Sequence, residues 1–154
     1  MNLNESLKKY GLTMPNPTAK GGVYEKVKEF GSNFCYLSGC TPTFNGEERF
    51  TGKIGRELSI EQGQEAARFC ALNLLANFIE KYGSLDKIKR IVKVLVFVAG
   101  SEDFFQQPTV ANGATELFVD ILGVEAGCGA RSAIGVYTLP RNAPVEVELL
   151  IELK

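Results

Sequence analysis

Residues 129–152 read GARSAIGVYTLPRNAPVEVELLIE. This stretch predicts two apolar strands joined by a turn bounded by Pro140 and Pro144, because strand-forming residues flank a cluster of turn-forming ones. Arg131 stands at the beginning of the first strand. An arginine in that place must either reach water or hold a negatively charged group.

Apolar side chains recur at every second position of the second of these strands. Positions 145, 147, 149 and 151 are apolar, whereas the positions between them include Glu146 and Glu148. Neighbouring side chains of a strand point to opposite faces, so one face is expected to be buried. In a hairpin turning at residues 141–142, Arg131 and Glu146 would lie about 20 Å apart, at about 3.3 Å per residue. Only a second subunit or a strong bend could then bring both to one small ligand.

Two helices are predicted upstream of this stretch. Ser59 and Gln62 form a capping box, an apolar stripe with helical spacing follows, and Gly83 ends the helix. The second helix is expected to begin near Pro108, a residue suited to a first turn, and to end at Gly123.

The remaining segments complete an α+β domain of residues 1–154. Strands are predicted at 23–30, 33–40 and 88–100. A turn-rich segment, compatible with a small hairpin, is predicted at 41–58 and a glycine-rich loop at 123–130. Residues 1–20 are interpreted as an N-terminal extension, with a short helix over 4–11 capped by Asn4 and a connector after it.

This order predicts a mixed sheet with both helices on one face. The segments 33–40 and 88–100 are apolar on both faces, so the open face of the sheet is expected to be covered by a partner subunit.

Composition excludes several kinds of chemistry. The 154 residues include no histidine, which rules out a histidine base, a Ser-His-Asp triad and a histidine metal ligand. The four cysteines form no C-x-x-C pair, so neither a metal nor another cofactor is expected, and each cysteine is interpreted as a small buried apolar residue.

Charge and hydropathy limit the partners. The formal net charge of −1 argues against nucleic acid, and the basic run 87–93 alternates as a solvated strand face does. No run approaches the roughly 18 apolar residues of a membrane span, so no membrane partner is predicted. We therefore expect a cytoplasmic protein. The loop 123–130 lacks the Lys-Ser/Thr of a P-loop.

Five motifs together resemble one known family. They are GVY at 22–24, YLSG at 36–39, IVKVLVFVAGSEDF at 91–104, VANGATELF at 110–118 and ARSAIGVYTLPRNAPVEVEL at 130–149. With them the chain resembles the RidA/YjgF family (reactive intermediate deaminase; endoribonuclease L-PSP-like). The resemblance implies a chorismate mutase-like fold and a homotrimer with a barrel-like core and clefts between subunits. It also implies hydrolysis of enamines and imines, such as 2-aminoacrylate, to 2-keto acids and ammonia.

The same resemblance implies seven site residues. Arg131 would clamp the carboxylate of a small metabolite, and Glu146 would act beside the hydrolytic water. The other positions that it places at the cleft are Tyr24, Ser38, Gly39, Asn112 and Ala133. From the residues alone, Arg131 could equally extend to solvent, and Tyr24 could pack across strands.

Some positions depart from the family pattern. Val23 stands where the family has proline, and Ala133 stands where active relatives have a cysteine. With the N-terminal extension and the long 41–58 segment, these differences place the chain in a longer, divergent subgroup. Three functions follow as hypotheses: a 2-iminobutanoate/2-iminopropanoate deaminase-like hydrolase, a non-catalytic trimer that binds a 2-keto acid for regulation, and RNA processing or translation inhibition.

Overall fold

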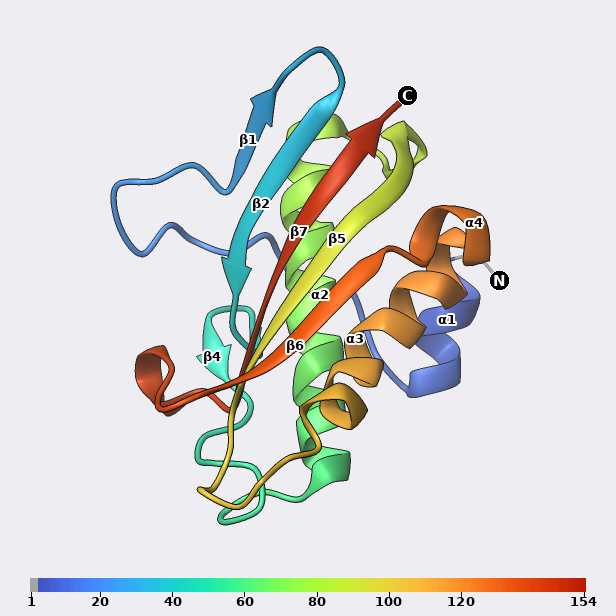
Figure 1. Ribbon diagram of the computed structural model, residues 1–154. Coiled ribbons are helices and arrows are strands. Elements are labelled where there is room, and N and C mark those ends of the chain that lie inside the picture. The colour runs from blue at the N-terminus through green and yellow to red at the C-terminus, as the bar shows by residue number, and fades with distance from the viewer. Residues whose placement is uncertain (1–2) are drawn as a thin grey trace.

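The computed structural model describes residues 3–154, and its centre is a five-stranded mixed sheet (Figure 1). The strands lie in the order β1 (Val27–Phe30), β2 (Phe34–Cys40), β7 (Val145–Leu153), β5 (Ile88–Ala99) and β6 (Ala130–Val136). β5 and β6 are parallel, and all other neighbours are antiparallel. The predicted α+β class with a mixed sheet is confirmed.

Both long helices lie on one face of the sheet, as predicted (Figure 1). α2 (Ile60–Tyr82) packs against β2 and β7, and α3 (Gln107–Leu122) packs against β5 and β6. α1 (Leu3–Tyr10) contacts α3 on its outer side. The short elements are β3 (Thr43–Phe44) and β4 (Glu47–Glu48), which form the small hairpin, the 3-10 helices η1 (Leu85–Lys87) and η2 (Pro140–Asn142), and α4 (Val124–Gly127) in the glycine-rich loop.

Local sequence signals place the ends of α2. The Ser59 Oγ accepts a hydrogen bond from the Gln62 backbone N–H at 3.2 Å, and the Gln62 Oε1 accepts one from the Ser59 N–H at 2.9 Å. Gly83 ends the helix with φ 81°, in the left-handed region that glycine tolerates. Asn4 is not the cap of α1, because that helix already includes Leu3.

The capping box gives a stability prediction. Ser59→Ala removes the acceptor for one of the unpaired N–H groups of the first turn, so we expect the free energy of unfolding to fall by about 1 kcal/mol. Urea denaturation measures this loss. Ser32→Ala, in the exposed β1–β2 turn, is the matched control and should change the unfolding midpoint little. Equal effects from both variants would contradict a role for the cap.

The predicted hairpin between the last two strands is wrong. β5 lies between β6 and β7, so these two strands never pair. The chain leaves β6, passes through η2 and returns at Pro144, whose carbonyl accepts a hydrogen bond at 2.9 Å from the N–H of Ala99, the last residue of β5. An alternating pattern specifies which face of a strand is buried but not which strand lies beside it. The first predicted strand is also shorter, since residues 23–26 precede β1.

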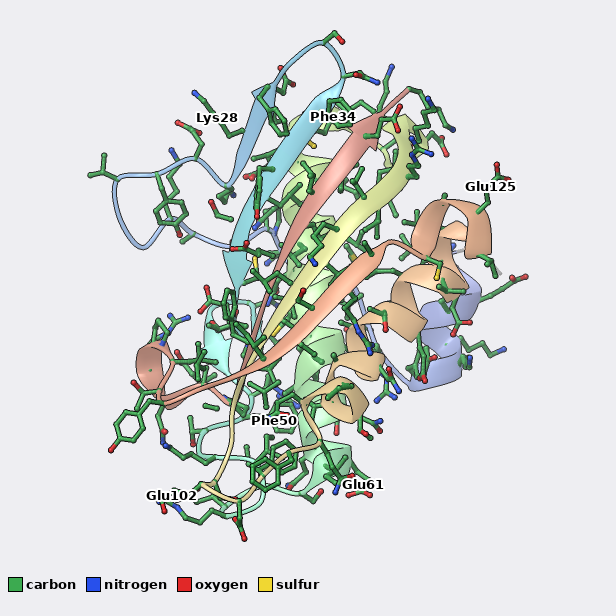
Figure 2. The ribbon with its side chains drawn as sticks, in the orientation of Figure 1. Lys28, Phe34, Phe50, Glu61, Glu102 and Glu125 are labelled. Carbon is green, nitrogen blue, oxygen red and sulfur yellow. The ribbon has the colours of Figure 1, made fainter. Side chains whose placement is uncertain are left out.

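The two faces of the sheet differ in burial. On the helix side, Val94, Val96 and Val98 of β5 are fully buried, as are the apolar positions of β7. The opposite face is open in the chain alone. It exposes apolar side chains, with Phe30 at 48%, Tyr36 at 42% and Ile134 at 45%. Figure 2 draws the side chains from this side, with Phe34 labelled at the upper end of β2.

Within residues 3–154, no helix is both long and apolar enough to cross a lipid bilayer.

Candidate functional site

Arg131 lies near the start of β6, at the edge of the sheet. It is opposite Val94, so its side chain lies on the helix-covered face. Its Nη1 donates hydrogen bonds to the Asn112 Oδ1 at 2.7 Å and to the Thr115 Oγ1 at 3.2 Å. Both acceptors are on α3, one helical turn apart. The structure therefore brings the predicted residues Arg131 and Asn112 together, and it adds Thr115.

The charge of Arg131 is not compensated within the described chain. Its two acceptors are neutral, and it forms no ion pair with any carboxylate of residues 3–154. Because Nη1 is occupied, the Nε–Nη2 edge remains as a planar pair of donors. Such an edge matches a carboxylate through two parallel charge-assisted hydrogen bonds.

A cavity of about 340 Å³ lies beside Arg131. It is lined by Lys9, Tyr10, Thr115, Glu116, Val119, Asp120, Cys128, Gly129 and Arg131. The helix α1, predicted as a short helix of the N-terminal extension but not as part of the site, thus contributes two residues to the surroundings of the arginine. The spacing of Asn112 and Thr115 on one helix face could have indicated the second acceptor; nothing in the local sequence indicated the α1 contribution.

Glu146 lies on the other face of the sheet. It is opposite Phe97, whose side chain points away from the helices. The Glu146 carboxylate forms no hydrogen bond or ion pair with another residue of the described 3–154 range. Burial raises the pKa of this carboxyl above its ordinary value, and the charge of Glu148 raises it further.

Gly39 makes room for that carboxylate. A Cβ atom at position 39 would collide with the Glu146 Oε1. The pairing of β2 with β7 is irregular between Leu37 and Cys40, which displaces Gly39 from regular register. Gly39 therefore acts by having no side chain, and it lets Glu146 lie directly against the backbone of β2.

Tyr24 and Ser38 lie near Gly39. The Tyr24 hydroxyl accepts a hydrogen bond from the Gly21 N–H at 3.1 Å, and Tyr24 lines a cavity of about 430 Å³ together with Gly39. The Ser38 Oγ donates to the Glu25 carbonyl at 2.6 Å, which ties the segment before β1 to β2. Gly39 alone lies directly against Glu146, Ser38 precedes it in β2, and Tyr24 shares the cavity with Gly39.

The seven predicted residues fall into two groups within one chain. Arg131, Asn112 and Ala133, which is opposite the buried Val96, lie on the helix side, whereas Glu146, with Gly39 against it, lies on the opposite face. Arg131 and Glu146 are three residues out of register and two strands apart, about 10 Å in each direction, and they lie on opposite faces. The 20 Å hairpin estimate was wrong because the hairpin does not exist. A single chain still does not present both side chains to one small ligand.

The cysteines are all free. Cys35, Cys40 and Cys70 are buried, as expected, but Cys128 is exposed and lines the cavity beside Arg131. Within residues 3–154, no three or more Cys, Asp or Glu side chains are grouped so that they could hold a metal ion.

The raised pKa of Glu146 predicts how one substitution changes stability. A carboxyl whose pKa is raised by folding costs stability as pH rises above its unfolded value of about 4.3. We expect Glu146→Gln to unfold at a higher urea concentration than the wild type at pH 7.5, with the difference shrinking toward pH 4. Glu125→Gln, on the exposed α4, is the control. A variant less stable than the wild type at pH 7.5 would contradict this account.

The mixed five-stranded sheet with both long helices on one face is the arrangement of the chorismate mutase-like fold. The chain matches the family described as "YjgF/chorismate mutase-like, putative endoribonuclease" over residues 4–153, and it belongs to that family.

Individual relatives support this assignment. Protein TCP17 of Trypanosoma cruzi is 38% identical over 148 residues, which cover 96% of this chain and 92% of TCP17. The crystal structure of Atu1372 from Agrobacterium tumefaciens, a protein described as of unknown function, is 36% identical with a TM-score of 0.89, covering 97% of this chain and 91% of that one. RidA from the Antarctic bacterium Psychrobacter is 27% identical with a TM-score of 0.59, covering 91% and 95%.

Proposed function

We propose that this protein is an imine and enamine deaminase, which hydrolyses small carboxylate-bearing intermediates to 2-keto acids and ammonia. The observation that carries the proposal is a pair of uncompensated charges of opposite sign, Arg131 and Glu146. Isolated charges in partly buried positions are costly unless a ligand pairs them. A protonated 2-imino acid carries the complementary pair, a carboxylate beside a cationic nitrogen.

The two charges meet only between subunits in this proposal. Their positions on opposite faces of one sheet, together with the exposed apolar side chains of the open face, support a homotrimer with shared clefts. Arg131, Asn112 and Ala133 of one subunit would face Glu146, Gly39, Ser38 and Tyr24 of the next. Each subunit would be one domain, and the protein would act in the cytoplasm.

The reaction follows from an electrophile that is already activated. The guanidinium of Arg131 holds the carboxylate, and Asn112 and Thr115 hold the guanidinium. Glu146 takes a proton from water as the water oxygen bonds to the imine carbon, and the C=N electron pair moves to nitrogen. The protonated Glu146 then returns the proton to that nitrogen. The C–N bond breaks as the carbonyl forms, and the hydroxyl proton leaves with ammonia as ammonium.

An enamine needs one earlier step, a proton added to its terminal carbon. A carboxyl with a raised pKa is suited to supply it, because more of the acid form is present near neutral pH. No cysteine side chain takes part in these reaction steps. Ala133 can therefore serve through its backbone alone.

The activity is tested directly. An amino-acid oxidase generates 2-iminopropanoate from alanine, and pyruvate and ammonia release are timed with and without the protein. We expect faster release in its presence. If the protein leaves the rate at the spontaneous value, the deaminase proposal is wrong.

A shared cleft is tested by mixing subunits. Arg131→Ala and Glu146→Gln are each expected to lose nearly all activity, but when equal amounts of the two variants associate at random into trimers, about a quarter of all clefts combine an intact Arg131 with an intact Glu146. Unfolding and refolding the two variants together should therefore restore about a quarter of the wild-type activity, and refolding them separately should restore none. Absence of recovery in trimers shown by mass spectrometry to be mixed would sink the shared cleft.

A second function is favoured by Ala133, which stands where active relatives of the family have a cysteine. The same site could bind a 2-keto acid without turnover, as a regulatory trimer does. Isothermal titration with pyruvate distinguishes the two, since binding without any acceleration of imine hydrolysis would favour the regulatory function.

A further inference from the structure

We infer that α1 makes the Arg131 cavity selective for monocarboxylates with an apolar side chain, and that Tyr10, Lys9 and Asp120 determine this selectivity. The inference rests on the proposed function of Arg131 as the carboxylate clamp. It goes further by naming the substrate class and by giving the N-terminal helix a role in recognition.

α1 is held firmly against the cavity. The Lys9 Nζ lies 2.6 Å from the Asp120 Oδ2, and the Tyr10 hydroxyl donates to the same oxygen at 2.7 Å. The Arg68 guanidinium lies 4.7 Å from the centroid of the Tyr10 ring, a cation–π distance. Tyr10 is thereby fixed at both its ring and its hydroxyl, so it is a rigid wall of the cavity.

The wall that faces the ligand is largely apolar. The Tyr10 ring, Val119 and Cys128 line the cavity around the arginine. Its volume of about 340 Å³ is near the lower end of the range of small-molecule sites, about 300–1,000 Å³. A ligand of amino-acid size, with its carboxylate on Arg131 and an apolar side chain against Tyr10, fits these dimensions.

The charges of the cavity disfavour a second carboxylate. The only other cation in the lining is Lys9, which is paired with Asp120, and Glu116 adds another acid. The hydrogen bonds from Lys9 and Tyr10 lower the pKa of Asp120, so it is ionised at neutral pH. The second carboxylate of a dicarboxylate would lie near Asp120 and Glu116, and the charge of Lys9 is already paired. The two acids would therefore repel such a ligand.

Substitution of Asp120 tests the selectivity. Imines generated from alanine, leucine and aspartate are compared by kcat/KM, and the wild type should prefer the first two. Asp120→Asn removes a negative charge and frees Lys9, so the ratio of kcat/KM for the aspartate-derived to the alanine-derived imine should rise about 10-fold. Tyr10→Ala should shift preference toward larger side chains, whereas Tyr10→Phe keeps the ring and should not. Lys8→Ala, exposed on α1, is the matched control and should leave the ratios unchanged.

Cys128 supplies a readout that needs no catalysis. It is the one exposed cysteine of the four, and it lines this cavity. Pyruvate and 4-methyl-2-oxopentanoate should slow its alkylation by iodoacetamide, and oxaloacetate should slow it less. Arg131→Ala should remove the protection.

The two readouts separate the inference from the proposed function. Protection by monocarboxylates without imine hydrolysis would end the deaminase proposal and support the cavity's selectivity. If Asp120→Asn and Tyr10→Ala hydrolyse imines with the same kcat/KM ratios between substrates as the wild type, the selectivity inference is wrong and the deaminase proposal stands. A Cys128 that fails to react in the native protein would show a closed cavity and would also overturn the inference.

Discussion

Arg131→Ala lowers kcat/KM for imine hydrolysis by about 100-fold, the expected result of losing a bidentate charge-assisted clamp of about 3 kcal/mol. The loss reflects both binding and orientation, because the arginine also sets the position of the imine carbon relative to the attacking water. Arg131→Lys keeps the charge but not the planar edge, and it should recover only part of the rate. The measurement is steady-state release of pyruvate from 2-iminopropanoate.

A second arginine substitution serves as the control for Arg131→Ala. Arg56→Lys changes an exposed arginine whose ion pair is with its sequence neighbour Glu57, and it should leave kcat/KM unchanged. Arg131→Ala should also unfold within about 1 kcal/mol of the wild type, since the partners that it leaves are neutral and close to the surface. A folded Arg131→Ala protein with kcat/KM within threefold of the wild type would remove the arginine from the site.

Gly113→Ala destabilises the fold by about 3 kcal/mol, which is the expected cost of overpacking at a position where the surrounding atoms cannot move aside. A Cβ at this position would lie 2.7 Å from the carbonyl carbon and 2.8 Å from the Cα of Gln64, and it would meet the Gln64 carbonyl oxygen more closely still. These are backbone atoms of α2, so no side-chain rotation relieves the collision. α2 and α3 must move apart, and their shared core opens.

Urea denaturation measures the effect, with Gly21→Ala as the control. Gly21 lies in the exposed connector, where an added Cβ would have only the Tyr24 hydroxyl nearby, at 3.9 Å. That variant should unfold at the wild-type midpoint, and a Gly113→Ala protein that does the same would disprove the close contact. Gly113 adjoins Asn112, so the same substitution should also displace an acceptor that holds Arg131.

Helices were predictable here because their signals are local. The Ser59–Gln62 capping box marks the start of α2 and Gly83 marks its end. Each acts through a hydrogen bond or a dihedral angle of its own residues. The apolar stripes then identified the face turned to the sheet. The same signals could not reveal α4, which has only four residues.

Strand order was not predictable from local signals. The segment 129–152 reads as a hairpin because two apolar strands flank a turn, yet β5 enters between them. Nothing within the segment records that insertion, because pairing depends on a strand some 40 residues earlier in the chain.

Some residues of the candidate site were indicated by the sequence, but their geometry was not. The family resemblance indicated Arg131 and Asn112, and the structure places them 2.7 Å apart. It did not indicate that Glu146 lies on the opposite face, which follows from β7 pairing with β5. The part played by Tyr10 depends on how α1 docks on α3, a long-range contact without a sequence signature.

The position of β7 bears on how the protein is made. This strand lies in the middle of the sheet, with β2 on one side and β5 on the other, yet it follows all the other strands in chain order (Figure 1). During translation β2 and β5 therefore emerge with their inner edges unpaired, and they cannot join until the last strand leaves the ribosome. Unpaired apolar edges are templates for aggregation. Nascent chains of this protein should consequently depend on chaperones until residue 153 has left the ribosome.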